Sequence, residues 1–247
     1  LYYLGAVFLE IGQSAGEAGN TARVDRLGDP AAPLPRIEEK GPRIETALQA
    51  FQYLRRLPGL SPESRPWRWA TFALGLAWVR IAERARANAA VKSEKWLGLY
   101  REAEAALLEG LERYVLKVRE DDPAGLDRDL EPEDYREVQR ARFVSEYYLG
   151  RVQAQLRKPE EARSRLEHCL DASRYPDALF EPSVAAAPAL IRPTLGETEG
   201  PSYPASLLRQ MRRSVFFLLG GLLLEEGERL QAEGKALAQE SKPAESA

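Results

Sequence analysis

Apolar residues recur every three or four positions in seven stretches of the chain, and this spacing is typical of helices that bury one face. The pattern predicts the end of a helix over 1–13 and further helices over 41–57, 66–89, 92–119, 132–157, 158–173 and 204–239. Polar segments rich in Pro and Gly separate them, and the longest, 14–40 and 174–203, are expected to be loops. No segment has a convincing strand pattern, so we expect an all-α fold.

Four of these helices contain the same short string, an aromatic residue followed by any residue, Leu and Gly. Its glycines are Gly5, Gly75, Gly150 and Gly220, spaced by 70, 75 and 70 residues. A glycine inside a helix costs about 0.5–1 kcal/mol relative to alanine. We therefore expect each glycine to mark a place where another helix packs closely, within an internal helical repeat.

Three of the four copies are followed by a second helix with a shared pattern of small and large residues. In chain order these residues are Ala47, Phe51 and Leu54; Ala103, Leu107 and Gly110; and Ala162, Leu166 and Cys169. Steps of four and seven keep residues on one helix face. The small residue at the first position allows the second helix to approach the first.

These residues resemble the tetratricopeptide repeat, a unit of two antiparallel helices in about 34 residues. The resemblance implies a right-handed solenoid of stacked helix pairs with long inter-helix loops. It implies one repeat domain over 1–240, and we place its copies at about 1–58, 64–120, 131–176 and 204–240, before a polar tail at 241–247. Copy three matches without a gap, whereas copy four lacks a recognisable second helix.

In tetratricopeptide proteins the first helices line a concave face that binds peptides or partner proteins. The resemblance implies that partner-binding positions here are Phe72, Arg80, Tyr147, Arg151 and Gln155, and Trp69 is a further candidate anchor. Arg80 and Arg151 could clamp a carboxylate together. The alternative is that the aromatic row, which also contains Tyr2 and Phe217, belongs to the core, and that the arginines are ordinary surface residues.

Composition argues against several classes of function. A net charge of −3 gives no footprint for nucleic acid. The single cysteine, Cys169, and single histidine, His168, exclude an intramolecular disulfide and leave almost nothing for histidine chemistry or a zinc site. Cys169 occupies a small-residue packing position, so we expect it to be buried and inert. The longest apolar run, Val215 to Leu224, is too short to span a bilayer.

We therefore expect a non-enzymatic protein-interaction scaffold without cofactors or metals, which binds a peptide or partner protein on the concave face of its repeats. One alternative is a structural subunit of a larger, membrane-associated or soluble assembly, contacting its neighbours through the long loops. Another is a regulatory module attached to an enzyme or membrane anchor elsewhere. The chain opens at Leu1 inside a repeat, so we expect further sequence upstream. The single cysteine favours a reducing compartment such as the cytoplasm.

Overall fold

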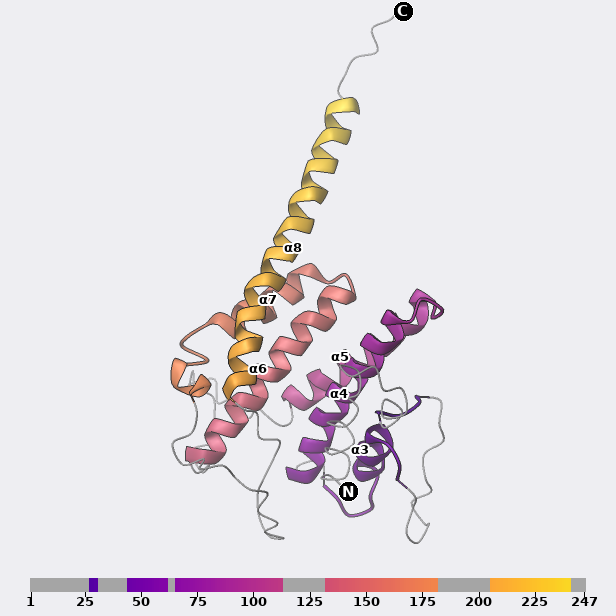
Figure 1. Cartoon of the computed structure of the whole chain (residues 1–247), viewed down its shortest axis with the longest axis vertical. Helices are drawn as coiled ribbons and strands as arrows, with labels where there is room; N and C mark the ends of the chain where they lie inside the picture. The colour runs from indigo at the N-terminus through magenta and orange to yellow at the C-terminus, as the bar shows by residue number, and fades with distance from the viewer. Residues whose placement is uncertain (1–26, 31–43, 62–64, 113–131, 182–204, 241–247) are drawn as a thin grey trace, which may run out of the picture.

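The computed structural model describes residues 27–30, 44–61, 65–112, 132–181 and 205–240, and within these ranges every regular element is a helix and none is a strand. The side chains of 65–66, 68–69, 132–138 and 238–240 lie outside the description. The all-α prediction is confirmed for the described residues. The elements are α3 (Ala47–Arg55), α4 (Arg65–Ala87), α5 (Ser93–Gly110), α6 (Pro132–Gln155), α7 (Pro159–Leu170), the short 3₁₀ helix η3 (Asp177–Phe180) and α8 (Ala205–Glu240) (Figure 1).

Most helix boundaries follow the start and stop signals of the sequence. α6 and α7 each begin at a proline, and Glu160 and Glu161 occupy the first turn of α7, where carboxylates favour the helix dipole. The helix predicted over 41–57 is shorter, because Thr46 caps it by accepting a hydrogen bond from the backbone N–H of Gln49. α5 ends at Gly110, and the stretch predicted to continue it, 113–119, lies outside the described residues.

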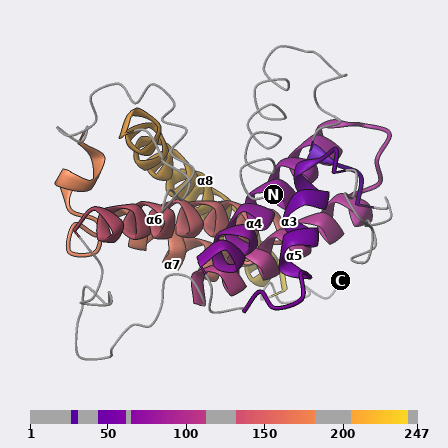
Figure 2. The same cartoon turned by 90° about the horizontal axis from the view of Figure 1, so that it is seen from below.

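Two antiparallel pairs, α4 with α5 and α6 with α7, form the body of the molecule (Figures 1 and 2). The close packing predicted at Gly75 and Gly150 is present in both. A Cβ added at Gly75 would lie 2.7 Å from Cγ of Leu107, and one at Gly150 would lie 2.7 Å from Cγ of Leu166. The small residues Ala47, Ala103, Ala162 and Cys169 are all fully buried.

The first pair also shows the reverse contact. Gly110 of α5 lies against Phe72 of α4, where an added Cβ would be 3.2 Å from the phenylalanine Cα. Gly75 therefore receives the side chain of Leu107, and Gly110 lies against the backbone at Phe72. This reciprocal arrangement lets two antiparallel backbones approach closely while their large residues remain buried.

Helix α8 differs from the other first helices. Its N-terminal half packs on α6, α7 and η3 through buried residues such as Leu208, Met211 and Val215, whereas its C-terminal half extends beyond the other helices (Figure 1). The prediction of close packing at Gly220 is wrong within this chain, because an added Cβ would meet nothing within 4 Å. The reason is that α8 has no second helix among the described residues. Gly5 lies outside them.

Ion pairs tie neighbouring helix pairs together and set the position of the site described below. Lys158, between α6 and α7, lies 2.8 Å from both carboxylate oxygens of Glu104 on α5. Gln153 of α6 donates a further hydrogen bond to the same carboxylate, at 3.2 Å. Because Glu104 is buried, these donors are needed to offset its desolvation, and they fix α6 against α5.

Candidate functional site

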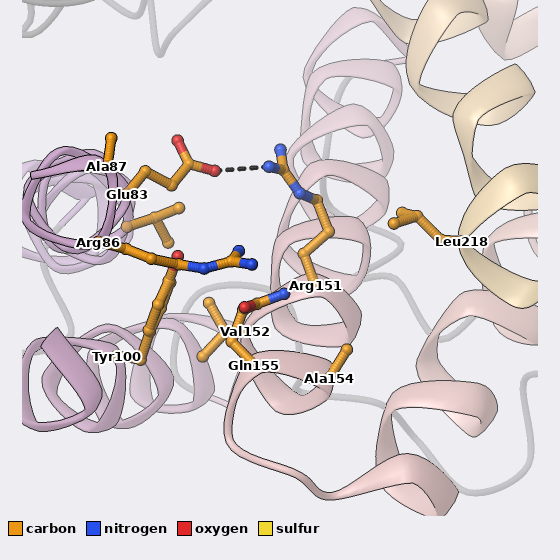
Figure 3. A pocket seen from close by; sticks show the side chains of 10 residues that line it. Glu83, Arg86, Ala87, Tyr100, Arg151, Val152, Ala154, Gln155 and Leu218 are labelled. Carbon is orange, nitrogen blue, oxygen red and sulfur yellow. Dashed lines mark hydrogen bonds and ion pairs between the residues drawn. The ribbon is translucent and has the colours of Figure 1, made fainter. Parts of the chain in front are cut away.

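A cavity of about 460 Å³ opens where the C-terminal ends of α4 and α6 meet the N-terminal end of α5 (Figure 3). One residue of α8, Leu218, also lines it. Its wall combines apolar and charged side chains, with two guanidinium groups and one carboxylate. The lining residues are Val79, Glu83, Arg86, Ala87, Tyr100, Arg151, Val152, Ala154, Gln155 and Leu218.

Arg80 and Arg151, predicted to share a face, do meet, and a carboxylate of the chain itself lies between them. Glu83 is 3.0 Å from Nη1 of Arg80 through Oε2 and 2.6 Å from Nη2 of Arg151 through Oε1. Three partly exposed charges thus connect α4 to α6. The two arginines predicted to bind a carboxylate of a ligand therefore already bind a carboxylate of the chain, that of Glu83, which lies one turn after Arg80.

Two tyrosines of α6 complete this connection. Arg80 donates a hydrogen bond of 2.8 Å to the hydroxyl of Tyr148, and the guanidinium of Arg151 lies 5.7 Å from the ring centroids of both Tyr147 and Tyr148. Burial raises the pKa of Tyr148, although the charges of Arg80 and Arg151 act against it. Its hydroxyl is therefore neutral at physiological pH. Arg151 is held by aromatic faces as well as by Glu83.

Arg86 is the charged residue of the cavity lining that does not connect α4 to α6. It is exposed, and its side chain lies beside the hydroxyl of Tyr100 on α5 (Figure 3). Burial raises the pKa of Tyr100, although Arg86 acts to lower it, so the phenol is neutral. Gln155, predicted from the repeat alignment, lies on the same wall as Arg151. With one carboxylate facing two guanidinium groups, the cavity lining has a surplus positive charge.

The aromatic row of the repeat alignment does not form a ladder on one surface. Phe72 has 1% of its surface exposed and packs against Gly110. It therefore belongs to the core and is not accessible for the predicted contact with a ligand. Tyr147 is also buried, and its hydroxyl lies 2.9 Å from Oγ of Ser214 on α8. Phe217, in contrast, is 82% exposed. The equivalent Tyr2, and the side chain of Trp69, lie outside the described residues.

Sequence reasoning missed Glu83, Arg86 and Tyr100. A signal existed for Glu83, because it lies three residues after Arg80 and therefore on the same face of the helix. Arg86 and Tyr100 meet only through the packing of α4 on α5, which hydrophobic spacing does not specify.

A second charged cluster, also missed, surrounds Glu146 on α6. This carboxylate is 1% exposed, accepts a hydrogen bond of 2.8 Å from Tyr175, and has three arginines and a histidine within 4 Å. Burial alone would raise its pKa, but the nearby imidazole of His168 at 3.7 Å, the hydrogen bond from Tyr175 and the charge of Arg142 outweigh burial and lower it. The other two arginines are Arg165 and Arg174.

The Glu146 cluster is closed rather than open to a ligand. Its members come from α6, α7 and the segment after α7, and Tyr175 is fully buried against the ring of Phe143. The cluster therefore ties these elements together. Nearby Cys169 is also buried, and burial raises the pKa of its thiol well above the usual range, as expected for an inert packing residue.

The described residues contain no group of three or more His, Cys, Asp or Glu side chains arranged to hold a metal ion. Within the same ranges, no helix combines the length and the apolar character needed to cross a bilayer.

Comparisons of the chain with protein-family models, with curated proteins and with solved structures found no match.

Proposed function

We propose that this chain is a non-enzymatic scaffold of tetratricopeptide-like helix pairs that binds a partner protein through the cavity between α4, α5 and α6. The ligand group is a carboxylate on an extended peptide, either an acidic side chain or a chain terminus. The proposal rests on one observation above all: Arg86 and Arg151 line one cavity that holds a single carboxylate, Glu83.

The different surroundings of Arg80, Arg86 and Arg151 support this proposal. Arg80 and Arg151 are held by Glu83 and the tyrosines, so they are positioned before a ligand arrives. Arg86 is exposed and lies beside a neutral phenol, so an incoming carboxylate would gain a charge-assisted hydrogen bond there without displacing another anion. The half-buried Leu218 and Ala154 provide apolar surface for the rest of the peptide, over the buried Val79 and Val152.

The ligand class is tested by selecting peptides from a random 12-residue phage library on the immobilised chain. We expect the selected peptides to share an Asp, Glu or free carboxyl terminus. Changing that carboxylate to the amide should weaken binding at least tenfold, equivalent to about 1.4 kcal/mol. Selected peptides that contain no shared carboxylate, or that tolerate the amide, would contradict the proposal.

The site is tested with Arg86→Ala, measured by isothermal titration calorimetry with a selected peptide. We expect a loss of affinity of about tenfold, because the exposed guanidinium can no longer pair with the carboxylate. Arg101→Ala is the matched control: Arg101 is an exposed arginine on α5 outside the cavity lining. Equal affinities for both variants would place the binding surface elsewhere. Circular dichroism before titration verifies that both remain folded.

The alternative of an assembly subunit that uses its loops depends on residues 14–40 and 174–203. Among these only 27–30 and 174–181 are described, and η3 packs against α6 and α8 of the same chain. No observation at the loops therefore favours that function over the cavity.

A further inference from the structure

The exposed face of α8 contains a heptad repeat of large and glycine residues. Phe216, Leu223, Leu230 and Leu237 are each more than half exposed and recur every seven residues. Gly220, Gly227 and Gly234 lie between them, also seven apart, and a Cβ added at any of the three would meet nothing within 4 Å. Alternating steps of four and three place both sets on one seam, the arrangement by which helices form coiled coils. We call these seven residues the α8 seam.

The α8 seam is unusual because it supplies both halves of a close helix contact. Helices α4 and α5 pack through Leu107 on Gly75 and Phe72 on Gly110, a reciprocal contact of a large residue with a glycine. The α8 seam contains the same two kinds of residue in alternation, but with no partner among the described residues. A second α8 running in the opposite direction, and crossing between Gly220 and Leu223, would place Leu223 of each helix on Gly220 of the other and Phe216 on Gly227. Small residues permit this closeness, as they do for helices in membranes.

The charge distribution of α8 favours one direction for that second helix, although Arg212 and Glu226 already pair within the chain, with Asp177 and Arg163. Residues 205–221 contain three arginines and no acid, whereas residues 222–240 contain five glutamates, one arginine and one lysine. Antiparallel pairing about the middle of the helix brings the basic half of each copy beside the acidic half of the other. Parallel pairing would place like charges together. The acidic half also disfavours an anionic lipid surface as the occupant.

We propose that the α8 seam is a self-association surface, on which α8 of a second copy of this chain packs antiparallel, crossing near Gly220 and Leu223. The symmetric pairing buries Phe216 and Leu223 of both copies in one contact. It does not involve the cavity wall formed by α4, α5 and α6, and Leu218, the α8 residue that lines the cavity, is not part of the α8 seam. Loss of self-association and loss of peptide binding are therefore separable results.

Sedimentation velocity of the full 247-residue chain over a concentration series tests this proposal. We expect the wild type to be a dimer at about 100 μM or below, a range that includes weak specific association. Leu223→Glu should be monomeric, because it places a charge at the centre of the seam. Ala232→Glu is the matched control, with the same added charge on an exposed residue outside the α8 seam, and it should remain a dimer. A monomeric wild type, including one that pellets with anionic vesicles, or a dimeric Leu223→Glu would overturn the proposal.

Gly220→Leu distinguishes specific packing at the α8 seam from nonspecific hydrophobic association. The substitution adds apolar surface and raises helix propensity, so nonspecific association would strengthen. We expect the dimer to weaken at least tenfold instead, because the leucine fills the hollow that receives the partner's side chain. A tighter dimer would overturn the proposed packing.

The direction of pairing is measured by spin labels at Ala236→Cys, since Cys169 is buried and does not compete for the label. With 1.5 Å of rise per residue, antiparallel helices crossing near the middle of α8 hold the two labels about 45 Å apart. Parallel helices hold them about 10 Å apart. The short distance would overturn the antiparallel arrangement.

Discussion

Replacing Glu146 by glutamine is expected to lower the free energy of unfolding by about 3 kcal/mol. The substitution keeps the shape of the side chain but removes the negative charge that faces Arg142, Arg165 and Arg174 at 3.7–3.9 Å. Because these arginines are partly exposed and can turn to water, the loss should fall at the lower end of the range for a broken buried pair. Urea denaturation measures it.

Glu167→Gln is the control for this prediction. Glu167 is an exposed carboxylate on α7, close in sequence to the cluster, and its substitution should change stability by less than about 0.5 kcal/mol. If both variants unfolded at the same urea concentration, the Glu146 cluster would not be stabilising. Tyr175→Phe provides a second measurement, since it removes the 2.8 Å hydrogen bond to Glu146 and should cost about 1–3 kcal/mol.

The same carboxylate predicts how stability depends on pH. The folded-state pKa of Glu146 lies below its ordinary value of 4.5, so the unfolded chain binds this proton more readily than the folded chain does. The stabilisation is fully present above pH 4.5 and is lost as the pH falls through the lowered pKa. We expect the stability difference between wild type and Glu146→Gln to shrink below pH 4.5. A difference that grew on acidification would show that the carboxylate is protonated in the folded state.

Local sequence predicted the helices because helix formation depends on neighbouring residues, and the repeated glycine string predicted their closest contacts because the same pattern recurs in each pair. Proline and acidic starts gave the beginnings of α6 and α7, and the glycine of the repeated string gave the contact with Leu107 or Leu166. The repeat alignment also brought Arg80 and Arg151 together, although it gave no indication of the carboxylate between them.

What the sequence did not predict depends on residues distant in the chain. The partners of Glu146 come from as far as Arg174 and Tyr175, after a second helix, and no periodic pattern identifies such a cluster. Neither interpretation of the aromatic row separated the exposed Phe217 from the buried Phe72 and Tyr147. The three strings match, but burial requires a covering helix, which α8 does not have among the described residues.

Opposite effects are expected from the same substitution at two glycines, Gly150→Ala and Gly98→Ala. At Gly150 the new Cβ would lie 2.7 Å from Cγ of the buried Leu166 and 3.3 Å from the carbonyl oxygen of Ala162, so the two helices must separate. Overpacking of this kind costs about 1–3 kcal/mol, more than the helix propensity gained. At Gly98, within α5, the Cβ meets nothing within 4 Å, and the gain of up to about 1 kcal/mol should be retained.

Thermal unfolding by circular dichroism compares the two variants at equal concentration. We expect the midpoint to fall for Gly150→Ala and to rise for Gly98→Ala. Both sites lie inside helices of the packed pairs, so the unfolded state and the intrinsic propensity change alike, and the difference reports the helix contact alone. A rise for both variants would mean that α6 and α7 can separate without cost. In that case the glycine of the repeated string would not be what requires the two helices to lie so close.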